Sequence, residues 1–210
     1  MRKTRKAAAV LTAVAMAAVS AVPAMADEIK DLYDYETQAR EVETWNILHS
    51  QSAADLNVLT NLYDGLVEAD EYGKVVPAIA ESWETEDNGI TWTFHLREGV
   101  KWVDQNGNEK GEVTAQDFLT GLEWVLNFHK NDATNTSMPM EMIVGAEDYY
   151  NMTSELDADA GLALTAESPE FADTVGIKAI DDYTLQYTCV SEKPYFDTVA
   201  TLSLIHISEP

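Results

Sequence analysis

The chain has 210 residues, of which 37 are acidic and 13 are basic, and its formal net charge is −24 at pH 7. An exterior this acidic repels nucleic acids and anionic lipids, so we expect neither as a partner. Hydrophobic residues make up 46% of the chain, which is enough for a packed core and excludes a wholly disordered protein.

A basic and then apolar segment opens the chain. Four basic residues lie among the first six, an uncharged run covers 7–22, and an A-x-A motif ends at Ala26. The pattern predicts a signal peptide over 1–26 and an exported protein, located in the periplasm or on the extracellular side. A transmembrane anchor is the alternative, which the short, alanine-rich run disfavours. No cysteine lies near the motif, so we expect no lipid anchor on a lipobox cysteine.

The next segments predict an arm, a strand and a helix. Residues 27–40 are polar and acidic and are interpreted as an N-terminal arm, whereas 41–45 has strand character. Apolar residues at helical spacing then predict a helix over 53–63. These residues are Leu56, Leu59, Leu62 and Tyr63.

Turn chemistry predicts a β-hairpin in the following stretch. Asp87-Asn88-Gly89 suits a reversal of the chain. Residues 90–96 alternate apolar and polar side chains, which is the period of a half-buried strand. Gly99 ends this strand, and 100–103 begins another.

A polar segment with two glycines, 104–112, is predicted to be a loop between that strand and a helix. A calcium loop is the alternative, but the spaced carboxylates and the closing glutamate that Ca²⁺ needs are missing. Asp157 and Asp159 are likewise interpreted as loop residues and not as calcium ligands.

Thr114 is predicted to open a helix, with its hydroxyl placed to cap and Asp117 as the acidic partner three residues later. Glu123 lies off the apolar stripe of this helix. The stripe consists of Phe118, Leu119, Leu122, Val125 and Leu126.

The second half of the chain predicts a further helix and a second hairpin. Residues 127–139 form a polar connection, 140–152 has helical spacing, and 154–170 is acidic and loosely patterned. Strand-like segments at 177–180 and 183–190 form the hairpin, and Pro194 is placed to start a helix. The residues of 140–152 expected to point inward are Met142, Ile143, Ala146 and Tyr149 or Tyr150.

No catalytic constellation can be found in the sequence. His49, His95 and His129 are scattered, and there is no H-E-x-x-H, paired cysteine, nucleophile elbow or phosphate-binding glycine loop. Cys189 is the only cysteine and reads as a buried, inert thiol rather than a nucleophile. We therefore expect a binding protein without catalytic residues, cofactor or metal, and not an enzyme.

Several consecutive motifs resemble one family. The chain contains LYDGLV, then IAESWE, then DNGITWTFHLREGVKW, and later IKAIDDYTLQYTCVSEKPYF. Together they resemble the bacterial extracellular solute-binding proteins of family 5, which serve oligopeptide, dipeptide and nickel ABC transporters. The resemblance implies a two-lobed α/β fold of the periplasmic-binding-protein type II class. Residues 27–201 would then hold only the N-terminal part of lobe I and its appended subdomain.

The resemblance also implies where a ligand is held. Peptide-binding relatives hold the ligand main chain like an added strand, and part of that contact corresponds to 41–46 here. A glutamate would face a ligand amine and Trp45 would line the cleft; alternatively the glutamates are solvated and Trp45 packs on the helix 53–63. The loop 132–138 corresponds to a second region that approaches the ligand. The candidate ligand-binding residues are Glu41, Val42, Glu43, Thr44, Trp45 and Asn46.

The function implied by the resemblance is that of a solute-binding component of an ABC importer. It would capture oligopeptides outside the membrane and deliver them to a permease with its ATPase subunits, and it would be a monomer at full length. Two alternatives stay open: another solute on the same scaffold, such as a nickel chelate, haem or an oligosaccharide, or a surface interaction protein without a transport role.

The last nine residues, LSLIHISEP at 202–210, do not continue the family pattern. They resemble the translation of a sequencing adapter, so we expect a truncated reading frame with a non-native tail. A genuine short protein is the alternative.

Overall fold

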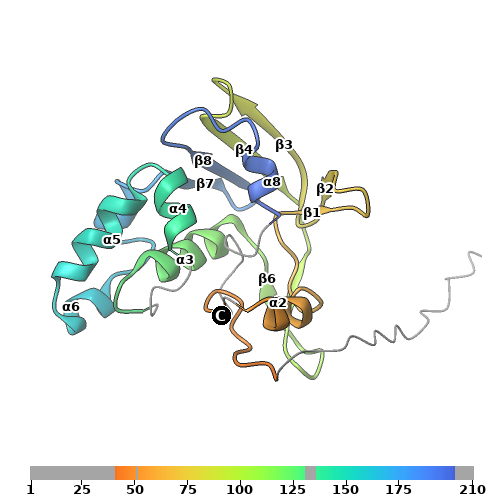
Figure 1. Ribbon diagram of the computed structural model, residues 1–210, viewed down its shortest axis with the longest axis horizontal. Coiled ribbons are helices and arrows are strands. Elements are labelled where there is room, and N and C mark those ends of the chain that lie inside the picture. The colour runs from red at the N-terminus through yellow and green to blue at the C-terminus, as the bar shows by residue number, and fades with distance from the viewer. Residues whose placement is uncertain (1–40, 51, 131–135, 202–210) are drawn as a thin grey trace, which may run out of the picture. The chain divides into compact units, whose positions relative to one another are not determined.

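The computed structural model describes residues 41–50, 52–130 and 136–201 (Figure 1). The predicted signal peptide and arm, the adapter-like tail at 202–210, and residues 132–135 of the second ligand region lie outside the described residues.

In the described chain, a series of strands follows the first helix, and a run of helices separates them from the last two strands and the last helix. The helices are α2 (Ala53–Leu59), α3 (Ala115–Leu126), α4 (Ser137–Met142), α5 (Ala146–Glu155), α6 (Ala158–Ala163), α7 (Pro169–Ala172) and α8 (Phe196–Val199). The strands are β1 (Val67–Ala69), β2 (Val75–Pro77), β3 (Ala80–Glu86), β4 (Thr91–Leu96), β5 (Lys101–Val103), β6 (Glu109–Glu112), β7 (Ile177–Asp181) and β8 (Thr184–Thr188).

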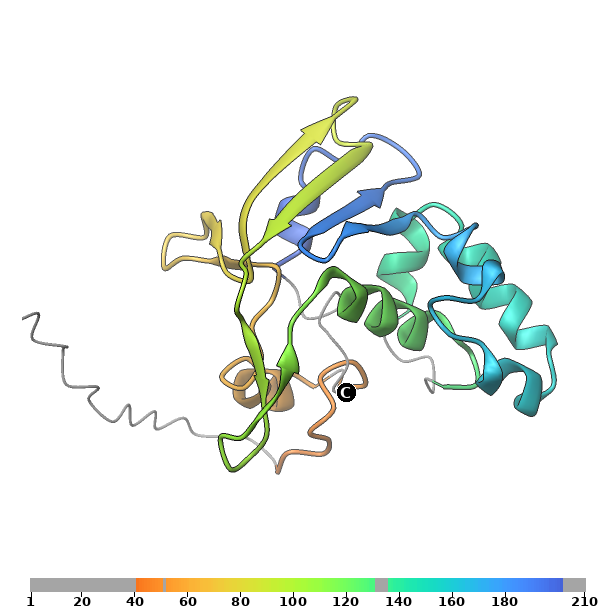
Figure 2. The same cartoon turned by 180° about the vertical axis from the view of Figure 1, so that it is seen from behind.

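An antiparallel sheet of order β3-β4-β8-β7 joins the two predicted hairpins, and Figure 2 shows it from behind. The β3–β4 turn has the left-handed backbone that its sequence predicts, with φ of 50° at Asp87, 56° at Asn88 and 91° at Gly89. β4 pairs with β8 from Thr91↔Thr188 to His95↔Thr184. Both hairpin predictions are therefore confirmed, and the sheet joins segments that are far apart in the sequence.

Aromatic side chains fill one face of this sheet. Trp92 and Phe94 alternate with partly exposed residues along β4, and Tyr187 of β8 is completely buried beside them. Phe196 of α8 packs on all three, with ring centroids 6.1 Å from Trp92, 6.5 Å from Phe94 and 5.3 Å from Tyr187. The helix predicted near Pro194 is thus present, but it begins at Phe196 and serves to cover the sheet.

The helix predicted over 53–63 is shorter than expected. α2 begins after Ser52, whose side chain accepts a hydrogen bond from Asp55 N–H, and it ends at Leu59. The chain then turns, with Tyr63 N–H still bonded to the Leu59 carbonyl. Leu62 is 58% exposed, so one member of the predicted apolar set faces solvent.

The segment 104–112 is only partly a loop, because its second half forms β6 and pairs with β5. The Asp104 carboxylate accepts hydrogen bonds from the main-chain N–H groups of Asn106 and Asn108, at 2.8 and 3.0 Å, and lies 3.0 Å from Lys110 Nζ. Asp104 therefore organises a hairpin turn. The prediction of a strand-to-helix loop is wrong at 109–112.

The helix predicted over 140–152 is interrupted. Ile143 leaves helical geometry and forms an isolated antiparallel bridge with Cys189. Gly145 then takes φ of 71°, and a Cβ placed on it would lie 2.1 Å from the Thr174 carbonyl oxygen. Pairing with a distant segment thus splits the stretch into α4 and α5, and the region predicted as loosely patterned contains α6 and α7.

Candidate functional site

The predicted ligand segment 41–46 belongs to no sheet in the described part of the chain. The strand expected there is therefore absent from this structure, and the main chain instead folds against the start of α2. Glu43 N–H donates to Asp55 Oδ1 at 3.0 Å, and Asn46 N–H donates to Thr44 Oγ1 at 3.1 Å. Local hydrogen bonds of this kind compete with strand pairing.

Buried residues anchor the end of this segment. Ile47 and Leu48 are each 3% exposed and pack in a small core with Leu59 and Val125. Asp55 is 1% exposed and also accepts a hydrogen bond from Ser50 Oγ at 3.1 Å.

The side chains of 41–46 are held at the surface by this anchor. Trp45 is 61% exposed, whereas Leu56 and Tyr63 pack against the small core. Glu41, Glu43 and Asn46 are exposed, and Val42 and Thr44 are half-buried. The six candidate residues thus form one accessible stretch beside α2.

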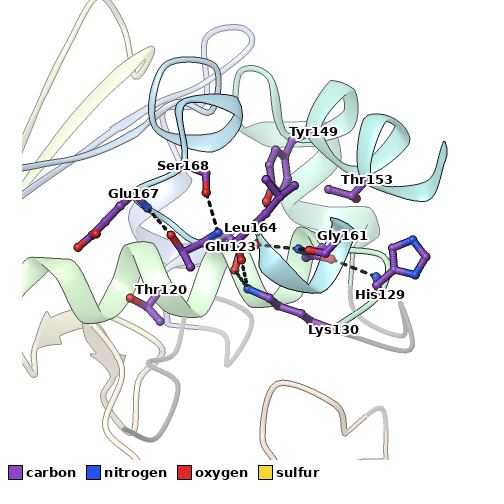
Figure 3. Close-up of polar contacts among 12 residues, drawn as sticks. Thr120, Glu123, His129, Lys130, Tyr149, Thr153, Gly161, Leu164, Glu167 and Ser168 are labelled. Carbon is purple, nitrogen blue, oxygen red and sulfur yellow. Dashed lines mark hydrogen bonds and ion pairs between the residues drawn. The ribbon is translucent and has the colours of Figure 1, made fainter. Parts of the chain in front are cut away.

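A buried polar network was missed by the sequence reasoning (Figure 3). Glu123 of α3 was predicted to lie off the apolar stripe, but it is 1% exposed. Its carboxylate accepts hydrogen bonds from Tyr149 Oη and Asn127 Nδ2, both at 2.8 Å, and pairs with Lys130 Nζ at 2.7 Å. A buried carboxylate needs such partners, because desolvation without them is costly.

The same network connects α3 with α5 and α6. Asn127 Nδ2 also donates to the Gly161 carbonyl at 2.9 Å, and Lys130 Nζ donates to the Leu164 carbonyl. Burial and the neighbouring Glu123 carboxylate raise the pKa of Tyr149, so its hydroxyl stays protonated and donates. The spacing i, i+4 and i+7 of Glu123, Asn127 and Lys130 was the available signal. The sequence contains no signal that would have identified their partners on α5 and α6.

His95, His129 and Cys189 take structural positions. His95 Nε2 lies 3.0 Å from Glu84 Oε1 across the β3–β4 pair, and His129 Nε2 lies 3.0 Å from the Leu156 carbonyl. Cys189 is 2% exposed, so its expected burial is confirmed, and burial raises its pKa to about 11.

The described residues contain neither a metal-binding cluster nor a membrane-spanning helix. In 41–50, 52–130 and 136–201, no group of three or more His, Cys, Asp or Glu side chains could hold a metal ion. Within those same ranges, no helix combines the length and the apolar character needed to cross a membrane.

A family model matches most of the chain. It describes bacterial extracellular solute-binding proteins, family 5 Middle, and it matches residues 74–210.

Curated relatives are oligopeptide-binding proteins. The oligopeptide-binding protein AliB of Streptococcus pneumoniae is 35% identical over 172 residues, which are 81% of this chain and 24% of AliB. The periplasmic oligopeptide-binding protein OppA of Salmonella typhimurium is 32% identical over 199 residues, or 93% of this chain and 32% of OppA. The chain thus spans about a quarter to a third of the length of these two relatives.

Solved structures give the same result. The substrate-binding domain of an oligopeptide ABC transporter from Bacillus anthracis superposes with a TM-score of 0.65 at 26% identity, over 83% of this chain and 29% of that one. OppA of Haemophilus influenzae, in complex with the peptide RPPGFSPFR, gives a TM-score of 0.61 at 26% identity, over 78% of this chain and 28% of that one. The expected fold class, α/β of the periplasmic-binding-protein type II kind, is confirmed.

Proposed function

The chain belongs to the bacterial extracellular solute-binding proteins of family 5, and on that premise we propose that its protein is the oligopeptide-capturing component of an ABC importer. The observation that carries the proposal is the 35% identity to an oligopeptide-binding protein over 81% of this chain. The protein would bind peptides outside the membrane, as a monomer, and pass them to a permease driven by ATPase subunits. Proteins of this family bind substrates, and no step of catalysis is assigned to this chain.

Residues 41–46 are proposed as part of the peptide contact. Their side chains are accessible while Ile47, Leu48 and Asp55 fix the main chain behind them. An anchored segment with exposed carboxylates suits a ligand amine, and an exposed tryptophan offers a large apolar surface at low entropic cost. Residues 132–138 are proposed as a second contact. A peptide that binds the closed arrangement of the two lobes more tightly than the open one would shift the protein towards the closed state.

The proposal is tested on the product of the full-length gene. A ligand that binds only the native state raises the melting temperature, by an amount set by its concentration relative to its Kd. The protein is melted with a random peptide pool, with oligosaccharides, with Ni²⁺ chelates and with haem. We expect stabilisation by the peptide pool alone; stabilisation by another class, with none by peptides, overturns the proposal.

The assignment of the contact to 41–46 has a separate test. Trp45→Ala in the full-length protein removes an exposed indole, and Tyr72→Ala is the matched control, because Tyr72 is 85% exposed in the β1–β2 turn. Buried aromatic contacts at interfaces cost more than about 1 kcal/mol when truncated, or more than about fivefold in Kd. We expect that loss for Trp45→Ala and no change for Tyr72→Ala. If the two variants bind peptide equally well, Trp45 is not part of the peptide contact, and the proposed function is unaffected.

A further inference from the structure

Two Asn-Gly pairs occur in the sequence, and both lie in hairpin turns. Asn88-Gly89 closes β3–β4, and Asn106-Gly107 closes β5–β6. Asn-Gly is the dipeptide most prone to spontaneous deamidation, because a glycine without Cβ lets its main-chain nitrogen approach the asparagine side chain. The two pairs have the same dipeptide sequence but different surroundings, so any difference in their reaction rates would come from the fold.

The Asn106-Gly107 turn is open. Both residues are exposed, and a Cβ placed on Gly107 would meet nothing within 4 Å. In the described part of the chain, the Asn106 side-chain amide has no hydrogen-bond partner. Gly107 N–H donates to the Asp104 carbonyl at 2.8 Å, and this single bond must open before the nitrogen can react.

In the Asn88-Gly89 turn, Gly89 is buried, although the Asn88 side chain is exposed. A Cβ placed on Gly89 would lie 2.6 Å from the carbonyl carbon of Lys193. The Gly89 carbonyl accepts hydrogen bonds from Lys193 N–H at 3.2 Å and from Trp92 Nε1 at 3.1 Å. The Asn88 amide donates to Glu192 Oε1 at 3.4 Å, and Gly89 N–H donates to the Glu86 carbonyl at 3.1 Å. Rotation of this peptide requires the 192–194 segment to move away.

We propose that Asn106 is a site of spontaneous modification in the folded protein and that the fold protects Asn88. The Gly107 nitrogen loses its proton to a solvent base and forms a bond to Cγ of Asn106. The Cγ–Nδ2 bond breaks, and the side-chain nitrogen leaves as ammonia, which gives a five-membered succinimide. Water then opens the ring at either carbonyl and leaves aspartate or isoaspartate at position 106. No oxidant or reductant is consumed.

The product changes the turn in two ways. Either product adds a carboxylate close to Asp104, whose carboxylate already accepts the Asn106 and Asn108 N–H groups. Isoaspartate also lengthens the main chain by one carbon, in a turn where β5 and β6 pair with an irregular register between Trp102 and Val103. The modification therefore alters the β5–β6 hairpin and leaves the four-stranded sheet β3-β4-β8-β7 intact.

The test follows both asparagines in one sample. The full-length protein is incubated in mildly alkaline buffer, folded and, in parallel, in denaturant, and peptide mapping by mass spectrometry records a mass gain of about one dalton at each site. A methyltransferase specific for isoaspartate labels the product independently. In the folded sample we expect position 106 to react at least about tenfold faster than position 88, the ratio that 1.4 kcal/mol of extra opening free energy produces. In denaturant we expect the two rates to be about equal.

Asn106→Gln is the control variant, because its longer side chain would have to close a less favourable six-membered ring. We expect it to abolish labelling at 106 and to leave the slow reaction at 88 unchanged. Circular dichroism and a cooperative urea transition confirm that each sample is folded before incubation. Equal rates at the two sites in the folded chain, or a faster reaction at 88, overturn the proposal. A large rate difference that persists in denaturant does so as well, because it would arise from sequence and not from the fold.

Discussion

Removal of the Lys130 charge should destabilise the protein strongly, although the residue lies within the polar segment 127–139. In Lys130→Met the Glu123 carboxylate loses the partner at 2.7 Å, and its side chain remains 2% exposed. Methionine keeps most of the aliphatic volume, so the change isolates the charge and its hydrogen bonds. The Leu164 carbonyl also loses a donor.

The magnitude follows from the burial of Glu123. Breaking a buried ion pair on one side costs about 3–5 kcal/mol, because an uncompensated charge stays in the interior. Tyr149 and Asn127 still donate to Glu123, each at 2.8 Å, so we expect the lower end, about 3 kcal/mol. That is a large part of the ~5–15 kcal/mol by which domains are stable.

Lys101→Met provides the matched control. Lys101 Nζ lies 2.8 Å from Glu112 Oε2, but the two side chains are 36% and 32% exposed. Pairs exposed to water contribute about 0–1 kcal/mol, so this variant should lose little stability. The two ion pairs have nearly the same length and differ in burial.

Urea unfolding measures both variants, with the midpoint reporting stability while the slope stays constant. The double variant Glu123→Gln/Lys130→Met should recover more than half of the loss, because a neutral amide replaces the stranded carboxylate. If Lys130→Met costs no more than Lys101→Met, or if the double variant is less stable than Lys130→Met alone, burial of the Glu123 charge does not determine the loss.

Three further predictions concern the sheet and its flanks. Gly89→Ala should cost at least about 2 kcal/mol of stability, since φ is 91° and the new Cβ would lie 2.6 Å from the Lys193 carbonyl carbon. Gly107→Ala, with φ of 77° and open space around the new Cβ, should cost about 1 kcal/mol. Similar urea midpoints for the two variants would contradict this. Tyr187→Phe should stabilise by about 1 kcal/mol, because the Tyr187 hydroxyl is buried without a partner in the described structure, and a lower midpoint would count against the idea. Hydrogen bonds from Lys101, Tyr183 and Gly99 lower the pKa of Glu112 to about 2 from 4.5, so its contribution is present above pH 4.5 and is lost as the pH falls towards 2. The stability difference between the wild type and Glu112→Gln should therefore shrink across that interval in urea titrations at each pH, and a difference independent of pH would be inconsistent.

Local patterns predicted the parts of the fold that depend on neighbouring residues. The alternation of 91–96 and the turn at Asp87-Asn88-Gly89 predicted the β3–β4 hairpin, and Thr114 with Asp117 predicted the start of α3. In the structure, Thr114 N–H donates to Asp117 Oδ2 at 2.7 Å. These features need only residues within a few positions, so a single sequence suffices.

Features that depend on distant partners were not predictable. Glu123 counts as polar in any helical pattern, and its burial becomes possible only through Tyr149, 26 residues later. The break at Ile143 arises from a bridge to Cys189, and the absence of a strand at 41–46 reflects the Asp55 acceptor within the next helix. The family resemblance supplied the candidate ligand contacts. The sequence pattern alone offered exposed glutamates and a tryptophan without a role.

The position of β8 between β4 and β7 determines when the four-stranded sheet can be completed. Thr93 and Gln186 are joined by a side-chain hydrogen bond across 93 residues, so one edge of β4 has no partner until that much more chain has been made. Until β8 arrives, β4 can pair only with β3, so its other edge is open and the apolar side chains of Trp92 and Phe94 lack the cover of Tyr187. An open, apolar strand edge is a typical binding target for a chaperone and a typical start of aggregation. Mutations that slow the arrival or docking of β8 should therefore lower the yield of folded protein more than they lower its stability.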